Sequence, residues 1–159
     1  LGHFRPVGMR WAVEDVGGWR VVNDGYNANP LSMRASLRAF ADWSAPGRKF
    51  LALGPMLELG AREPAEHEAL GRFVAEGRWA GVAVVPWTSA GGVPDAAAQA
   101  LATGFRAGGR AAETLCAASG PAEAAAWLRA RLRPGDALLL KASRGVRIET
   151  VLEALKKES

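Results

Sequence analysis

The stretch Asp136-Ala137-Leu138-Leu139-Leu140 (residues 136–140) is typical of a strand buried on both faces of a sheet, because its apolar residues follow one another without alternation. Two earlier runs, Lys49–Leu53 and Gly81–Val85, have the same character. Helical patterns separate the three runs along the chain. Apolar strands that alternate with helices predict an α/β domain, with a mostly parallel sheet of about six strands and helices on both faces.

Helical periodicity and breaker residues give the expected bounds of the other elements. Asn29 and Pro30 are a good N-cap and a good first helical residue, so the first helix begins there. In the final helix the apolar residues recur at helical spacing, at Ile148, Val151, Leu152 and Leu155. Further helices are expected over Pro64–Glu76, Pro94–Ala102 and Pro121–Leu132, and a further strand over Ala111–Leu115.

The N-terminal part of the chain predicts a β-hairpin. Residues from Arg10 to Val16 alternate with period two, as in a half-buried strand, and Gly17-Gly18 suits a tight turn. The partner strand is expected over Trp19–Asp24.

Composition places the chain among globular proteins of one domain, with 159 residues, 49% hydrophobic and 23% charged. No run approaches the roughly 18 apolar residues of a membrane span. The start of the chain lacks the pattern of a secretory signal, and one cysteine excludes a disulfide framework, so we expect a cytoplasmic protein. The net charge of +4 comes from cations that stand singly or in pairs, which argues against a nucleic-acid partner.

Ligands of such sheets bind at the carboxyl ends of the strands, so the loops after Asp24, Leu53 and Leu140 are the candidates for function. The first loop carries a carboxylate, a phenol and two carboxamides: Asp24, Tyr26, Asn27 and Asn29. An aspartate at a strand end can accept hydrogen bonds from a ribose. Asn29 alone is better explained as a helix cap, whereas a simple turn would not need both Asp24 and Asn27.

In the second loop Met56, Leu57 and Leu59 stand between glycines. They either plug the end of the sheet or line a pocket for an apolar part of a ligand. In the third loop Lys141, Ser143 and Arg144 follow a buried strand directly. Lys141 and Arg144 both suit a carboxylate or a phosphate. Arg144 and Arg147 are cations near a helix N-terminus, where they oppose the helix dipole, so we favour ligand binding over a solvated loop.

Other reactive residues favour structural roles. His67 shares a helical stripe with Leu70 and Val74 and has no nucleophile at a readable spacing, so we expect a packed or half-exposed residue. Cys116 is expected to be a small buried residue. The chain contains no HExxH, CxxC, GxGxxG or phosphate-loop motif, so no metal site is predicted.

At the three loops the sequence resembles the C-terminal domain of the Mur ligases, and most closely the type that adds D-Ala-D-Ala. The resemblance runs from about Pro6 to Leu155. Its motifs are Asp24-Gly-Tyr-Asn-Ala-Asn-Pro-x-Ser-Met33, Leu53-Gly-x-Met-Leu-Glu-Leu-Gly60, His67-x-x-x-Gly71 and Lys141-x-Ser-Arg-Gly145.

The resemblance implies a Rossmann-like domain that is one of three in an ATP-dependent amide ligase of bacterial peptidoglycan synthesis. The other two, N-terminal and central, would hold UDP-MurNAc-tripeptide and most of the ATP with Mg²⁺. ATP would convert the peptide carboxylate into an acyl phosphate, which the amine of D-Ala-D-Ala attacks. Residues 1–159 would then be a single C-terminal domain, inactive alone, and residues 1–9 would be the end of an interdomain linker.

The resemblance also implies roles for individual residues. Nucleotide binding would involve Arg10, Asp24, Asn27 and Asn29, and the dipeptide would contact Tyr26, Met56, Leu57, Lys141, Ser143 and Arg144. Three positions depart from the family pattern. Met9 and Pro55 replace a usual Gly and a usual Asp, and Asn23 replaces a frequent Asp.

Two alternative functions stay open at this point. One is a non-catalytic nucleotide- or peptide-binding module that stands alone. The other is the corresponding domain of a sister ligase, either another Mur ligase or a folylpolyglutamate-type enzyme.

Overall fold

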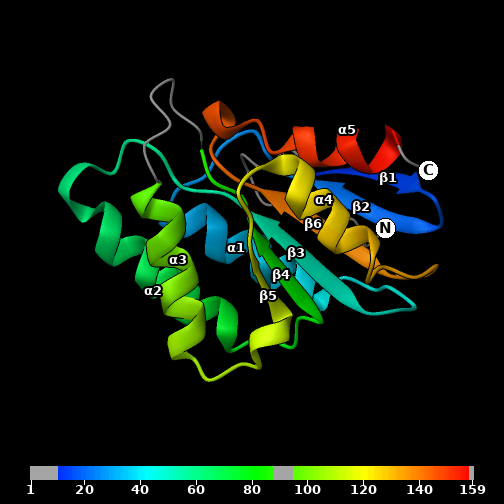
Figure 1. Ribbon diagram of the computed structural model, residues 1–159, viewed down its shortest axis with the longest axis horizontal. Helices are drawn as coiled ribbons and strands as arrows, with labels where there is room; N and C mark the ends of the chain where they lie inside the picture. Colours follow the sequence, from blue (N-terminus) through cyan, green and yellow to red (C-terminus); the bar gives the residue numbers. More distant parts are fainter. Residues whose placement is uncertain (1–10, 88–94, 158–159) are drawn as a thin grey trace.

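A computed structural model describes residues 11–87 and 95–157, and Arg10 lies outside these ranges. The chain alternates strands and helices as expected (Figure 1). The strands are β1 (Ala12–Val16), β2 (Trp19–Asn23), β3 (Lys49–Leu53), β4 (Gly81–Val84), β5 (Leu115–Ala117) and β6 (Ala137–Lys141). The α-helices are α1 (Pro30–Asp42), α2 (Glu63–Ala75), α3 (Ala96–Ala107), α4 (Pro121–Arg129) and α5 (Glu149–Lys157).

Within the described residues the sheet has six strands in the order β1-β2-β6-β3-β4-β5. β1 pairs antiparallel with β2 and forms the predicted hairpin, and the other neighbouring strands are parallel. Helices cover both faces of the sheet (Figure 1). This arrangement confirms the predicted α/β fold with its N-terminal hairpin.

The unbroken leucines of β6 divide between two hydrophobic cores, one on each face of the sheet. Leu139 packs in the core that includes residues of α1, α2 and α3. Leu138 and Leu140 pack in the core that includes residues of α4 and α5. Because successive side chains of a strand point to opposite faces, a strand covered on both sides needs apolar residues at every position.

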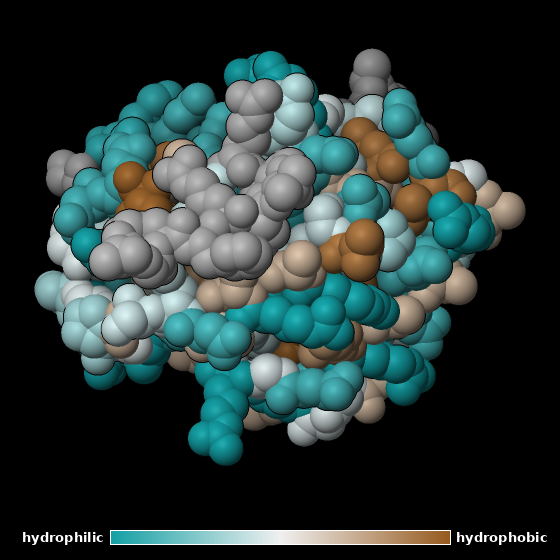
Figure 2. Space-filling view, turned by 180° about the vertical axis from the view of Figure 1, so that it is seen from behind, coloured by the Kyte–Doolittle hydropathy of each residue, from teal (hydrophilic) through white to brown (hydrophobic). Residues whose placement is uncertain are grey.

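The described surface carries few large apolar side chains. On the face shown in Figure 2, apolar residues form small separate spots among hydrophilic ones. Among the described residues, those that are large, apolar and exposed are Val13, Tyr26, Leu31 and Trp87. No described helix is long and apolar enough to cross a bilayer.

Three expected element bounds were wrong. The helix expected to end at Ala102 continues to Ala107, because Gly104 is a packing contact with α2 rather than a helix breaker. The strand expected over Ala111–Leu115 lies at Leu115–Ala117, after a 3-10 turn that Thr114 closes by donating to the Ala111 carbonyl. Helix α4 ends at Arg129, three residues early, and turns follow it.

Asp136 joins three segments at the amino end of β6. Its buried carboxylate accepts hydrogen bonds from the backbone N–H groups of Arg48 and Arg133, at 2.8 and 2.9 Å, and from the Arg48 guanidinium at 2.8 Å. Burial alone would raise the pKa of Asp136, but these hydrogen bonds outweigh it and hold the pKa below its usual value. The ionised carboxylate therefore stabilises the folded state.

We expect Asp136→Asn to lower the free energy of unfolding by about 2 kcal/mol at neutral pH, because charged hydrogen bonds are lost. The folded-state pKa lies below the unfolded one, so this stabilisation is present above the unfolded pKa. It disappears as the pH falls through the folded pKa, and wild type and variant should converge in acid. Urea unfolding at neutral and at acid pH measures the difference in the free energy of unfolding between wild type and variant. Asp15→Asn, at an exposed position, is the control. An equal loss at both pH values would contradict the role of the charge.

Candidate functional site

The three predicted loops lie together at the carboxyl edge of the sheet, because β2, β6 and β3 are neighbours in it (Figure 1). Backbone hydrogen bonds continue the ladder into the loops. The N–H of Asp24 donates to the Leu140 carbonyl, and the N–H of Gly54 donates to the Lys141 carbonyl, each at 2.9 Å. The three loops named as candidates therefore share one edge of the sheet.

Lys141 and Asp24 form a buried ion pair between the third loop and the first. The Lys141 Nζ lies 3.0 Å from the Asp24 Oδ2, and each side chain is 1% exposed. Nζ also donates to the backbone carbonyls of Asn27, at 2.9 Å, and of Asp24, at 3.4 Å. Ser36 of α1 donates to the Asp24 carboxylate at 2.5 Å. Burial lowers the pKa of Lys141, and the Asp24 charge opposes that shift.

This geometry bears on two predicted ligand contacts. The ammonium of Lys141 has three N–H donors, and acceptors within the protein surround it. The carboxylate of Asp24 faces Lys141 and Ser36 rather than solvent. A substrate contact of Lys141 and a ribose contact of Asp24 stay predictions, and each would require this pair to open.

The second loop packs into the protein. Met56 is fully buried in the core beside α1 and α2, so it plugs the end of the sheet. Leu57 is half-buried, and a Cβ on Gly145 of the third loop would lie 3.0 Å from its Cδ1. Pro55, the departure from the family pattern, is buried and its carbonyl accepts a hydrogen bond from the Ser143 N–H.

Asn29 caps α1, as its position predicted. Its Oδ1 accepts from the Ser32 N–H at 2.8 Å, and the Ser32 hydroxyl accepts from the Asn29 N–H at 2.9 Å, which completes a capping box. Its nucleotide contact stays a prediction. Tyr26 and Asn27, between Asp24 and this cap, are both exposed.

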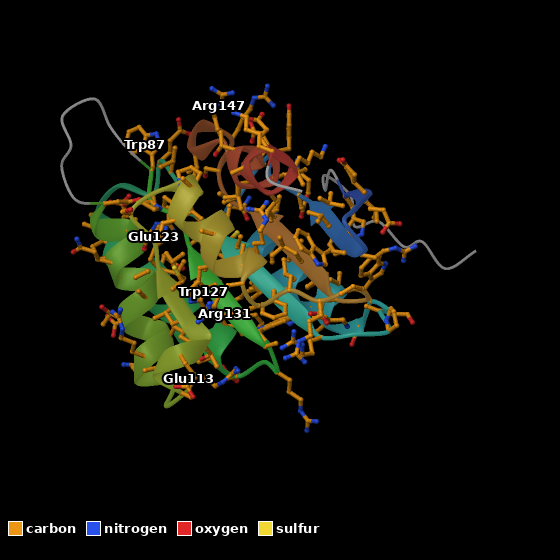
Figure 3. All side chains as sticks on the ribbon, turned by 45° about the vertical axis from the view of Figure 1, so that its right-hand side comes forward. Trp87, Glu113, Glu123, Trp127, Arg131 and Arg147 are labelled. Carbon is orange, nitrogen blue, oxygen red and sulfur yellow. The ribbon has the colours of Figure 1, made fainter. Side chains whose placement is uncertain are left out.

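An open cleft of about 680 Å³ lies beside the first and third loops. Tyr26 and Arg144 form one wall, with the guanidinium carbon 5.4 Å from the ring centre. Arg147 also lines the cleft. Its backbone is left-handed, with φ of 58° and ψ of 55°, and its Nε lies 3.6 Å from Glu149. Figure 3 shows Arg147 at the same end of the molecule as Trp87, which follows β4.

Sequence reasoning missed two polar residues of this cleft, Asn23 and Glu149. Asn23 ends β2, where its Oδ1 accepts from the Gly25 N–H at 3.1 Å. Its place directly before Asp24 could have indicated it, whereas no local pattern marks Glu149.

In the described part of the chain no three His, Cys, Asp or Glu side chains are grouped to hold a metal ion.

Comparisons with known proteins agree on one family. The sequence model described as "Mur ligase, glutamate ligase domain" matches residues 9–144. The UDP-N-acetylmuramoyl-tripeptide–D-alanyl-D-alanine ligase of Mycobacterium tuberculosis H37Rv is 39% identical over 150 residues, covering 87% of this chain. The ligase of the same name from Mycobacterium leprae is 36% identical over 151 residues. This chain spans 29% and 28% of the lengths of these relatives.

Solved structures show the same likeness. MurF ligase from Thermotoga maritima, in complex with ADP, is 32% identical with a TM-score of 0.75, and the match covers 98% of this chain and 32% of that one. MurF from Acinetobacter baumannii is 26% identical with a TM-score of 0.75, over 93% of this chain and 30% of that one. With more than half of its residues matched by the family model, this chain belongs to the Mur ligase family, to its glutamate ligase domain.

Proposed function

We propose that this chain is the C-terminal, substrate-closing domain of a MurF-type ligase, which adds D-Ala-D-Ala to UDP-MurNAc-tripeptide in peptidoglycan precursor synthesis. The observation that carries the proposal is 39% identity over 150 residues with ligases of that name. Residues 1–159 are one domain in this proposal, with residues 1–9 as the end of a linker. The ligase acts in the bacterial cytoplasm.

The proposed reaction has two steps. A carboxylate oxygen of the tripeptide attacks the γ-phosphorus of ATP, so that ADP leaves and an acyl phosphate forms. The amine of D-Ala-D-Ala then attacks the acyl carbon, loses a proton, and expels inorganic phosphate as the amide forms. ATP and Mg²⁺ are held mainly by a central domain, so the isolated chain is inactive in this proposal.

The cleft suggests how this domain holds the dipeptide. Arg144 is exposed on the wall of the cleft, and its guanidinium suits a carboxylate through two parallel hydrogen bonds. Tyr26 presents an aromatic face beside it. Leu57 packs close to Gly145, which lines the cleft next to Arg144. We therefore assign the dipeptide carboxylate to Arg144 rather than to the buried Lys141.

The nucleotide side of the domain would involve Arg10 and the first loop. Asn27 is exposed there, so its carboxamide is open to a polar ligand. Asp24 would act mainly by placing this loop, since its carboxylate is paired with Lys141. A closing domain that offers few nucleotide contacts is expected to bind ATP weakly alone.

The direct test is ADP formation by the complete ligase that carries this chain, with UDP-MurNAc-tripeptide present and D-Ala-D-Ala added or withheld. We expect turnover that requires the dipeptide and no turnover by the 159-residue chain alone. Turnover that ignores D-Ala-D-Ala would refute the substrate assignment. Tight ATP binding by the isolated chain in calorimetry would favour a module that stands alone.

Within that ligase, Arg144→Ala should raise the KM for D-Ala-D-Ala about 10- to 100-fold, because a charged hydrogen-bonding pair is lost. The KM for ATP should change by less than about threefold. Steady-state ADP release measures both constants. Arg72→Ala, on the exposed face of α2, is the matched control and should leave both unchanged. A larger effect on the ATP constant would contradict the assignment.

A further inference from the structure

Ser143 is the residue at which all three loops of the carboxyl edge meet. Its N–H donates to the Pro55 carbonyl at 3.1 Å, which joins the third loop to the second. Its hydroxyl accepts from the Leu57 N–H at 2.8 Å and donates to the Ala28 carbonyl at 3.3 Å, which adds the first loop. Ser143 is 7% exposed, so these partners occupy a hydroxyl with little access to solvent.

His67 holds the same second loop from the side of α2. Its Nε2 accepts from the Met56 N–H at 2.8 Å, and its Nδ1 lies 2.7 Å from the Glu63 carbonyl. Because Nε2 accepts, the proton of the neutral ring is on Nδ1, which donates to Glu63. The side chain is fully buried, as expected for a packed residue, and both ring nitrogens have partners.

Met56 and Leu57 are thus consecutive residues whose N–H groups both donate to buried side chains of other segments. A backbone N–H that lost such a partner inside the protein would be left without a hydrogen bond, which the loop could relieve only by moving. Leu57 packs against Gly145, next to Arg144, so any such movement reaches the wall of the cleft.

We propose that His67 and Ser143 are positioning residues, which fix the Pro55–Leu57 segment and thereby set the place of Arg144 in the cleft. Neither side chain touches the substrate in this proposal. The expected effect on catalysis rests on the proposed ligase function. The positioning of the Pro55–Leu57 segment can be measured in the chain without ligands.

Amide hydrogen exchange by NMR on the ligand-free 159-residue chain tests the positioning. Ser143→Ala should speed exchange of the Leu57 amide by about tenfold or more, since its acceptor is lost. His67→Phe should speed exchange of the Met56 amide in the same way. His67→Gln retains an acceptor and a donor, so it should restore much of the protection of this amide. Amides of the β1–β2 hairpin are the internal control. Unchanged exchange at Met56 and Leu57 in Ser143→Ala and His67→Phe would overturn the proposal.

Kinetics of the complete ligase separate positioning from direct contact. Because Arg144 would be displaced, Ser143→Ala and His67→Phe should raise the KM for D-Ala-D-Ala about tenfold, in the same direction as Arg144→Ala, with recovery in His67→Gln. A higher dipeptide KM in Ser143→Ala, with normal exchange of the Leu57 amide in the free chain, would show direct contact by Ser143 and overturn its positioning role. If the wild-type ligase ignores D-Ala-D-Ala, the proposed function fails while the exchange result still decides the positioning.

Discussion

Replacing Lys141 with methionine should lower the free energy of unfolding by about 3–5 kcal/mol, because the buried Asp24 carboxylate loses its cation. Methionine has a similar volume and leaves the apolar surroundings filled. The carbonyls of Asp24 and Asn27 also lose a donor. Urea unfolding followed by circular dichroism measures this loss of free energy. In a thermal unfolding experiment the same loss should lower Tm by roughly 10 °C for a domain of this size.

Two comparisons show whether charge pairing is the cause. Lys156→Met removes a cation that pairs with Glu14 on the surface, where both side chains are more than 40% exposed, and should cost less than about 1 kcal/mol. Asp24→Asn in the Lys141→Met background removes the carboxylate charge that Lys141 faces in the wild type. The double variant should be more stable than the sum of the single losses predicts, by more than about 1 kcal/mol. Strict additivity, or a loss equal to that of Lys156→Met, would contradict the buried pair.

The sequence contains a signal for the burial of Lys141, which an interpretation of the third loop by itself does not use. Lys141 comes two residues after Leu139, so both side chains lie on the same face of β6. Leu139 is fully buried in the core beside α1, and Lys141 lies over the same core. A cation at a strand end is easily interpreted as a ligand contact, and only its partner, more than a hundred residues away in the chain, decides otherwise.

Local sequence patterns gave correct predictions where a feature depends on a single segment. The Asn29 cap, the turn at Gly17-Gly18 and the leucines of β6 each depend on neighbours in sequence, and each is where it was expected. The cleft instead combines residues from β1, the end of β2, the first loop, the third loop and the start of α5. Glu149 enters it because the left-handed turn at Arg147 redirects the chain into α5, and such a conformation at a non-glycine residue has no signature in sequence.

Gly104 shows the same limit for the fold. A glycine in a helical pattern lowers the expectation of a helix, so the pattern alone ends α3 at Ala102. In the structure, a Cβ on Gly104 would lie 2.0 Å from the Glu68 carbonyl oxygen, and a Cβ on Gly71 would lie 2.1 Å from the Leu101 carbonyl oxygen. The two glycines therefore let the backbones of α2 and α3 meet, and the packing compensates for the helix propensity that glycine lacks.

Gly104→Ala should consequently lower the free energy of unfolding by about 3 kcal/mol, although alanine is the better helix former by about 1 kcal/mol. The clash is with backbone, so no side-chain rotation relieves it, and α2 has to move. Thr103→Ala, at the exposed neighbouring position, gains the same kind of propensity without the contact and should stay within about 0.5 kcal/mol of wild type. Thermal unfolding of both variants measures the contrast, and a Gly104→Ala chain that melts above wild type would refute the contact.

The displacement should also reach the candidate site. Glu68, whose carbonyl Gly104 faces, is the next residue after His67, which holds the Met56 N–H. A shift of this turn of α2 lengthens that hydrogen bond, so exchange of the Met56 amide should rise in folded Gly104→Ala more than exchange in the β1–β2 hairpin. The same measurement on Thr103→Ala should show no such rise. Equal exchange at Met56 in both variants would mean that the loop is held independently of α2, and the positioning role would then rest on Ser143 alone.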